Sequence, residues 1–159
     1  MKTELTCFRK LKDLNDTPEQ IISVLISVQE HRQKIVCVTV SVSYDCNNTI
    51  SAIDFREYSL IAAEHISASC IGKAFCEINR DVLVITDIGI EPPYRSMGYG
   101  TLLMKEILKY IRCVKVNRIC GKVFHEDIAE DSDKERFYRF YQKYGFDIID
   151  DKRIYLKLK

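Results

Sequence analysis

The chain has 159 residues, a length that suits one domain with one core, so residues 1–159 are predicted to form a single domain. Apolar residues make up 47% and charged residues 30%, which excludes a disordered chain, and no apolar run approaches the ~20 residues of a membrane span. The net charge is only +1, so no whole-protein field would attract nucleic acid or an anionic membrane surface.

The N-terminus and the cysteines indicate the compartment. Residues 1–6 lack the hydrophobic region of a signal peptide, so we expect a cytosolic (cytoplasmic) protein. The seven cysteines are odd in number and form no Cys-x-x-Cys pair, and several occupy strand positions with an apolar pattern. We therefore expect reduced, buried thiols rather than disulfides or metal ligands.

A capping pattern predicts a helix near the N-terminus. Thr17 can cap such a helix, and Pro18 suits the first helical position. The apolar stripe that follows, from Ile21 to Val28, predicts that the helix runs to about Arg32.

Strands are predicted on both sides of that helix. From Ile35 to Ser43 the apolar period changes to two, which predicts a strand with one buried face. A turn at residues 45–48 separates it from a hairpin. The other strand patterns of this half lie at residues 5–11, 58–66 and 71–78, of which the last two form the hairpin.

The second half of the chain has the pattern of a strand-helix-strand crossover. Residues 82–88 are a nearly continuous apolar run, which predicts a central strand buried on both faces. A helix after Gly100 then buries Leu103 and Ile107. In a right-handed crossover, ligands gather at the carboxyl ends of the strands. The remaining predicted elements are a strand at 114–124, a helix at 134–144 ended by Gly145, and strands at 146–149 and 153–158.

The turn between the central strand and its helix is predicted to bind an anion. Gly98 and Gly100 leave the main chain bare where the helix begins, and the first N–H groups of a helix have no partner within it. The helix dipole and the cation of Arg95 favour a phosphate there. Leu103 stands where the dinucleotide fingerprint requires Gly or Ala, and Thr101 stands where an ATP-type loop requires Lys. Without further context, a turn whose glycines serve only packing is an equally good interpretation.

Two motifs in the right order carry a family resemblance. The pattern Arg95-x-x-Gly98-x-Gly100, after a strand ending in Ile88-x-Ile90, resembles the acyl-CoA pyrophosphate loop of the GNAT acyltransferase superfamily. Residues 140–146, Phe-Tyr-Gln-Lys-Tyr-Gly-Phe, resemble the aromatic-tyrosine signature near the end of GNAT proteins. The resemblance covers residue 71 to the C-terminus by motif and the first seventy residues by element order. It implies an α+β (α/β/α-like) GNAT fold, whose mixed sheet is splayed between two central parallel strands and flanked by helices.

The resemblance also implies a function. A GNAT protein is an N-acetyltransferase that moves an acetyl group from acetyl-CoA to a primary amine by direct attack. Main-chain groups of Ile88 and Ile90 would bind the pantetheine, and an N–H near Ile90 would polarise the thioester carbonyl. Tyr141 matches the tyrosine that protonates the departing thiolate in many members, although its aromatic neighbours at helical spacing also suit a packed core. The implied pyrophosphate-binding residues are Arg95, Ser96, Met97, Gly98, Tyr99, Gly100 and Thr101, and no metal is expected.

Several points stay open. An alkyl amine of pKa ~10.4 is almost wholly protonated at pH 7, so a base or a water chain must accept its proton. A CoA-binding or regulatory protein of the same fold without transfer activity, or an unrelated phosphate-binding α/β domain, would also fit the loop. The acceptor amine and the oligomeric state, a homodimer included, are not specified. Candidate bases near the strand ends are Glu64, His65, Asp87, Glu91 and His125.

Overall fold

A computed structural model describes residues 21–32, 34–45, 47, 49–61, 67–122, 131–150 and 153–158. The elements are β1 (Ile21–His31), β2 (Lys34–Tyr44), β3 (Ile50–Ile61), β4 (Ser67–Asn79), β5 (Val82–Ile90), the 3-10 helix η1 (Pro92–Tyr94), α1 (Tyr99–Ile111), β6 (Arg118–Lys122), α2 (Asp131–Gln142), β7 (Asp147–Ile149) and β8 (Arg153–Lys157). The predicted strand at residues 5–11 and the predicted cap at Thr17 lie outside the described residues.

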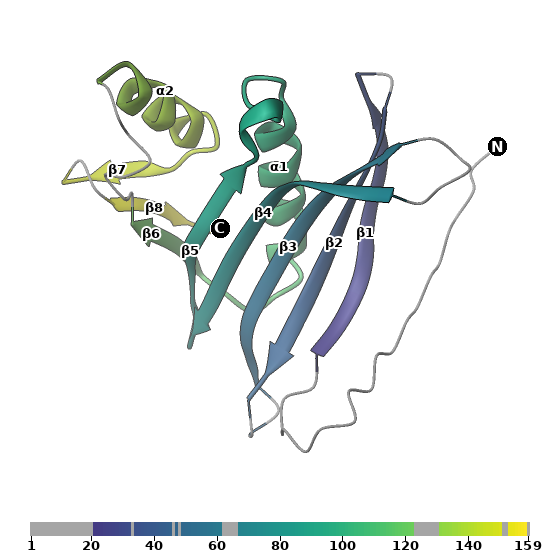
Figure 1. The fold of residues 1–159 in the computed structure, drawn as a ribbon. Coiled ribbons are helices and arrows are strands. Elements are labelled where there is room, and N and C mark those ends of the chain that lie inside the picture. The colour runs from purple at the N-terminus through teal and green to yellow at the C-terminus, as the bar shows by residue number, and fades with distance from the viewer. Residues whose placement is uncertain are drawn as a thin grey trace.

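The described strands form one mixed sheet (Figure 1). Its eight strands follow the order β1-β2-β3-β4-β5-β6-β8-β7. β5 and β6 are parallel, whereas the other described neighbours are antiparallel. Helix α1 packs on one face of the sheet and contacts β3, β4 and β5, and α2 lies beside β7. No described helix is long and apolar enough to cross a membrane.

The helix predicted up to Arg32 is wrong over its described part. Residues 21–31 form strand β1, which pairs with β2 from Ile21 opposite Ser43 to His31 opposite Lys34. The apolar residues of this stretch are mainly isoleucine and valine, whose branched side chains suit a pleated strand better than a helix. The same residues also fit a helical stripe, so pairing with β2 decided between the two patterns.

The next three strands follow the predicted patterns. β2 buries its four valines, from Val36 to Val42, on one face, as predicted for residues 35–43. β3 and β4 form the predicted antiparallel hairpin. β3 begins at Ile50, well before the predicted start at Tyr58, because its residues continue to pair with β2 as far as Tyr44.

The predicted crossover is confirmed, with one correction. β5, α1 and β6 follow one another, and β5 and β6 pair in parallel. The expectation that β5 is buried on both faces is wrong: Leu83 and Ile85 are buried, whereas Asp87 is exposed. Helix α1 covers one face of the strand, and the described chain leaves Asp87 on the other face in solvent. The helix buries Tyr99, Leu103, Met104, Ile107 and Ile111.

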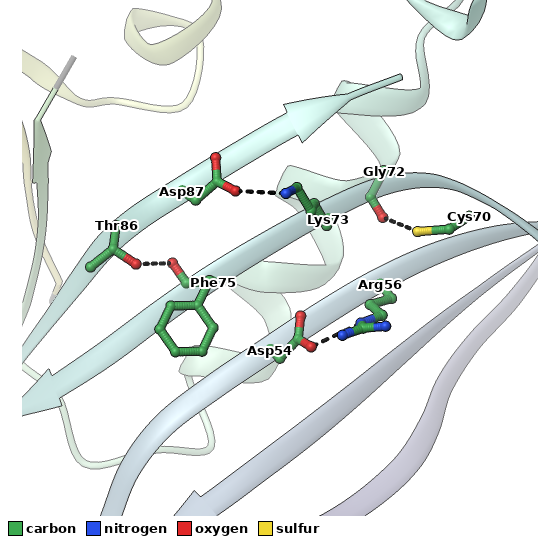
Figure 2. Close-up of polar contacts among 8 residues, drawn as sticks. All are labelled: Asp54, Arg56, Cys70, Gly72, Lys73, Phe75, Thr86 and Asp87. Atoms are coloured by element: carbon green, nitrogen blue, oxygen red, sulfur yellow. Dashed lines mark hydrogen bonds and ion pairs between the residues drawn. The ribbon is translucent and has the colours of Figure 1, made fainter. Parts of the chain in front are cut away.

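The face of the sheet turned away from α1 is polar (Figure 2). On β3, Arg56 Nε lies 2.9 Å from Asp54 Oδ2, and across β4 and β5 Lys73 Nζ lies 3.1 Å from Asp87 Oδ2. Phe75 stands among these ion pairs and is 41% exposed. These four charges are therefore paired and partly solvated. We call this side the open face, and the side that α1 packs against the covered face.

The C-terminal elements confirm the predicted helix and strands. α2 ends at Gln142, and Gly145 at φ +84° takes the left-handed conformation that commonly ends a helix. β8 lies between β6 and β7 and is antiparallel to both. β6 begins at Arg118, later than predicted, and residues 123–124 of the predicted strand lie outside the described residues.

The described cysteines only partly follow the expectation of buried thiols. All five are free; Cys37 and Cys76 are buried, whereas Cys70 and Cys113 are exposed. Burial raises the pKa of the Cys76 thiol to about 12, so that thiol carries almost no thiolate at neutral pH. Cys76 is therefore a packing residue rather than a nucleophile.

Candidate functional site

Strand β5 extends beyond its pairing with β6 in the part of the chain that the structure describes. There, β5 pairs with β6 only over residues 82–85, whereas the strand runs to Ile90. The N–H of Glu91 donates to the carbonyl of Ile71 on β4 at 2.9 Å. Because main-chain groups alternate sides along a strand, those of Ile88 and Ile90 face the opposite side, toward the opening. This edge can pair with an extended, amide-bearing ligand.

Arg95 ties the end of β5 to the loop that follows. Its Nε donates to the carbonyl of Ile90 at 3.0 Å, and the side chain is exposed. A guanidinium has five N–H donors in a fixed fork, so this hydrogen bond leaves donors for an anion. Arg95 can therefore hold the strand end and a phosphate together.

The loop between Arg95 and Gly98 enters α1 through two left-handed residues. Ser96 has φ +61° and Gly98 has φ +90°. The N–H of Thr101 donates to the carbonyl of Gly98 at 3.0 Å, which starts the helix. Within the described chain, the N–H groups of residues 96–100 have no main-chain acceptor. These groups, at the positive end of the α1 dipole, form a cradle of donors that can bind an anion.

The two glycines of the loop are not equivalent. A Cβ on Gly98 would lie 3.2 Å from His31 Cε1, and the φ of +90° disfavours any side chain. A Cβ on Gly100 would lie 3.5 Å from Ile90 Cγ1 and 3.7 Å from Phe140 Cε2, which is ordinary contact. Packing therefore accounts for Gly98 and does not account for Gly100, whose bare main chain suits a close ligand.

The tip of the β1–β2 hairpin lies against this loop. His31 Nε2 and Arg32 Nε lie 2.7 and 3.0 Å from the carbonyl oxygen of Met97. The ring of His31 packs edge-on against Tyr99, with 4.8 Å between centroids. The sequence patterns did not predict this contact, because β1 was expected to be a helix and the partners are separated by more than sixty residues.

Helix α2 and the residue Tyr144 just after it contact the loop before α1 and the first turn of α1. The hydroxyl of Tyr144 donates to the carbonyl of Thr101 at 3.2 Å, and Arg136 Nη1 lies 3.5 Å from Ser96 Oγ. Together with the Phe140 ring beside Gly100, these contacts join the second sequence motif to the first.

Tyr141, the predicted general acid, lies in an aromatic cluster. It is 2% exposed. Its ring centroid lies 4.6 Å from that of Phe137, 5.2 Å from that of Phe140 and 5.4 Å from that of Phe146. The ring therefore packs in the core, on the helix that also contacts the loop.

A carboxyl group that the sequence patterns did not single out lies near the end of β5. Glu57 on β3 is 0% exposed, and within the described chain neither of its carboxyl oxygens has a hydrogen-bond partner. A Cβ on Gly72 would lie 3.1 Å from Glu57 Oε2 and 2.5 Å from Ile90 Cδ1, so the bare Gly72 leaves room for both side chains. Glu57 interrupts the buried face that Ile53 and Phe55 begin, a signal that could have revealed it.

Burial raises the pKa of the Glu57 carboxyl to about 8. A buried carboxyl without partners costs stability, and such groups cluster at functional sites. The described candidate bases differ from it: Asp87 forms the ion pair with Lys73 on the open face, and Glu91 is exposed. The other candidates, Glu64, His65 and His125, lie outside the described residues. No group of three or more His, Cys, Asp or Glu side chains among the described residues could hold a metal.

Known proteins resemble this chain in sequence and in fold. The model of the acetyltransferase (GNAT) family matches residues 40–146. The chain is 28% identical over 120 residues to N-alpha-acetyltransferase 50 of Danio rerio, an alignment that covers 73% of this chain and 67% of that protein. It is 27% identical over 129 residues to "Probable N-acetyltransferase san" of Drosophila melanogaster, covering 79% and 66%. The chain thus spans about two thirds of the length of these curated relatives.

A solved structure supports the same fold. The PaiA N-acetyltransferase of Thermoplasma acidophilum, in complex with coenzyme A, superposes with a TM-score of 0.53 at 17% identity, over 70% of this chain and 64% of that one. The predicted fold class and the acetyltransferase class are confirmed at the level of the family. Since the family model matches well over half of the residues, the chain belongs to the acetyltransferase (GNAT) family.

Proposed function

We propose that this protein transfers the acetyl group of acetyl-CoA to the α-amino group at the N-terminus of a polypeptide. The open edge of β5 carries the proposal, because the main chain at Ile88 and Ile90 leads directly into the N–H cradle of residues 96–100. The name of the relative N-alpha-acetyltransferase 50 supports an α-amine as the acceptor. The predicted cytosolic location and homodimer stay predictions.

The proposed binding residues fall into two groups. Ile88 and Ile90 would bind the extended arm of the co-substrate through main-chain groups, and Arg95 with the N–H groups of residues 96–100 would hold its diphosphate. Thr101, whose N–H already bonds to Gly98, would contribute through its place in the first helical turn. When bound, acetyl-CoA supplies an acetyl thioester for attack by the amine. The N–H of Ile90 would donate to the thioester oxygen as charge develops on it.

An α-amine reduces the cost of freeing the attacking lone pair. Its pKa is ~7.7–8.0, compared with ~10.4 for a lysine side chain, so deprotonation at pH 7 costs about 1 kcal/mol instead of about 4 to 5. Glu57, whose pKa of about 8 lies close to that of an α-amine, is our proposed proton acceptor, reached through one water. Its carboxyl is unpaired within the described chain and separated from the side chain of Ile90 only by the bare Gly72.

Tyr141 is the proposed proton donor to the departing thiolate. A thiolate of pKa ~8.5 can take a proton from a tyrosine of pKa ~10 at a cost of only about 2 kcal/mol. The helix that carries Tyr141 contacts the proposed phosphate loop, residues 95–100, through Phe140 beside Gly100, and Tyr144 just after that helix donates to Thr101 of α1, which supports a shared site. Tyr141→Phe keeps the ring packing and removes the hydroxyl. We expect a lower kcat with an unchanged KM for acetyl-CoA, and full turnover across the pH range would leave Tyr141 as a core residue.

The reaction is tested by release of free thiol from acetyl-CoA in the presence of paired peptides. One peptide of each pair has a free N-terminus, and the other has an acetylated N-terminus and an internal lysine. We expect thiol release with the free N-terminus alone. Release with the lysine peptide alone would refute the α-amine. Binding of CoA without turnover on any amine would favour a regulatory protein of the same fold, and thermal stabilisation by nucleotides but not by CoA would favour an unrelated phosphate-binding domain.

A further inference from the structure

The hairpin tip, defined as His31 and Arg32, holds one carbonyl group of the phosphate loop. We infer that these two side chains are positioning residues: they fix the Met97–Gly98 peptide so that its N–H points outward, toward the bound diphosphate. The inference rests on the proposed function and assigns to β1 and β2 a part in cofactor binding.

Two donors converge on the Met97 carbonyl oxygen. His31 Nε2 lies 2.7 Å from it and Arg32 Nε lies 3.0 Å from it. A carbonyl oxygen only accepts, so His31 carries its hydrogen on Nε2, and the oxygen has lone pairs for both donors. The peptide plane is therefore held from the hairpin side by two hydrogen bonds, one of them from a permanent cation.

Because a peptide bond is planar, fixing the Met97 carbonyl also fixes the direction of the Gly98 N–H. All peptide bonds of the described chain are trans, so the C=O of Met97 and the N–H of Gly98 point in opposite directions. With the oxygen turned to the hairpin, the N–H points away from it, and within the described chain this N–H has no main-chain acceptor. A flipped peptide would replace that donor by an oxygen, which repels a phosphate.

Residues with left-handed backbone conformations occur on both partners of the contact between the hairpin tip and the loop. Four described residues other than glycine have positive φ: Arg32 at +50°, which makes this contact, Ser96 at +61°, which precedes Met97, and two residues elsewhere. Gly98 follows at φ +90°, and its missing Cβ leaves the room that the His31 ring occupies. Left-handed residues persist only where surrounding contacts hold them, and they are common at ligand sites.

Aromatic packing fixes the hairpin tip in turn. The His31 ring stands edge-on to Tyr99, and Tyr99 stands edge-on to Tyr94 at 5.7 Å between centroids. Lys34 Nζ lies 5.7 Å from the centre of the Tyr94 ring, which adds a cation–π contact from β2. His31 thus both packs and donates, and a test must separate these roles.

The test compares a phosphate-bearing thioester with one that lacks phosphate. His31→Phe keeps the ring and removes the donor, His31→Gln keeps a donor, and Arg32→Ala removes the cation. Arg80→Ala is the matched control, because Arg80 is also an exposed arginine with positive φ, at +57°, in the β4–β5 turn. KM and kcat are measured for acetyl-CoA and for S-acetylpantetheine, together with CoA binding and the melting temperature.

We expect about ten- to hundred-fold weaker CoA binding in His31→Phe and Arg32→Ala, because the N–H of Gly98 would no longer be held in place to donate to the charged diphosphate. The kcat/KM for S-acetylpantetheine should not change, His31→Gln should restore much of the affinity, and Arg80→Ala should match the wild type. Equal losses on both thioesters, or unchanged CoA affinity, would overturn the inference. If His31→Phe melts early, exposed Arg32 still provides the test. A wild-type protein that binds no CoA would instead refute the proposed function, and this inference with it.

Discussion

Similar residues lie in opposite environments on the covered face and the open face of the sheet. On the open face, Asp87 is paired with Lys73 and exposed, and Phe75 is 41% exposed. On the covered face, Glu57 and Phe55 are both 0% exposed, and Glu57 has no hydrogen-bond partner in the described chain. A solvated ion pair contributes little energy, whereas a buried single carboxyl is costly. Glu57, whose burial lowers the stability of the fold, is therefore a better candidate for the catalytic base than Asp87.

Truncating one phenylalanine on each face should give the largest contrast. Phe55 is fully buried and packs edge-on against Tyr110 of α1 at 5.6 Å. We expect Phe55→Ala to lower the free energy of unfolding by about 3–5 kcal/mol and Phe75→Ala by less than about 1 kcal/mol. Urea unfolding of both variants checks this. Equal losses would mean that the open face is covered in solution.

Replacing one carboxyl on each face should change the pH dependence of the free energy of unfolding on the covered face only. The pKa of Glu57 is raised to about 8 in the folded protein from its ordinary value of 4.5. Between these values the folded state holds a proton that the unfolded state has released, so the free energy of unfolding falls as pH rises. Glutamine does not titrate, so Glu57→Gln removes this pH-dependent loss. Between pH 5 and pH 8 we expect the free energy of unfolding of the variant to rise by a few kcal/mol relative to that of the wild type.

The same variant should lose activity while it gains stability at pH 8. If Glu57 accepts the proton of the acceptor, Glu57→Gln lowers kcat and leaves the KM for acetyl-CoA unchanged. Asp87→Asn on the open face is the control, and its stability should change by about 0.5 kcal/mol or less. A pH-independent difference between Glu57→Gln and the wild type would show that the carboxyl finds a partner in solution.

Replacing the two loop glycines, Gly98 and Gly100, should give a smaller difference in stability. Gly98→Ala combines a φ of +90° with a Cβ 3.2 Å from the His31 ring, so we expect a loss of about 1–3 kcal/mol. Gly100→Ala places its Cβ at ordinary contact distance in a helix, and we expect a gain or loss of less than about 1 kcal/mol. Thermal melting of both proteins without ligand distinguishes them. Equal destabilisation would mean that Gly100, too, is required by packing.

The smallest predicted effect is that of Arg95 on the choice of acceptor peptide, because its proposed role lies in CoA binding. Arg95→Glu should weaken CoA binding strongly, because it replaces a cation by an anion beside the diphosphate. The preference among acceptor peptides should not change, since the role proposed for the loop is to bind the co-substrate and not the acceptor. A changed acceptor preference with intact CoA affinity would contradict the proposed place of Arg95.

Short-range signals determined the second half of the molecule. Pro92 and Pro93 end β5, Gly98 opens α1 and Gly145 closes α2, each through a backbone preference that acts within a few residues. The crossover, the loop and the aromatic helix were therefore predictable from the sequence alone, as was the family.

Only the tertiary structure decided the first half and its contribution to the site. Residues 21–31 fit both a helical stripe and a strand, and the choice depended on pairing with β2. The contact of His31 and Arg32 with Met97 joins residues more than sixty positions apart. The alternation along β3 indicates that Glu57 is buried, but only the folded chain shows that its carboxyl has no hydrogen-bond partner among the described residues. Local preferences carry no information on such long-range neighbours, because the energies that set them, burial and pairing, exist only in the folded chain.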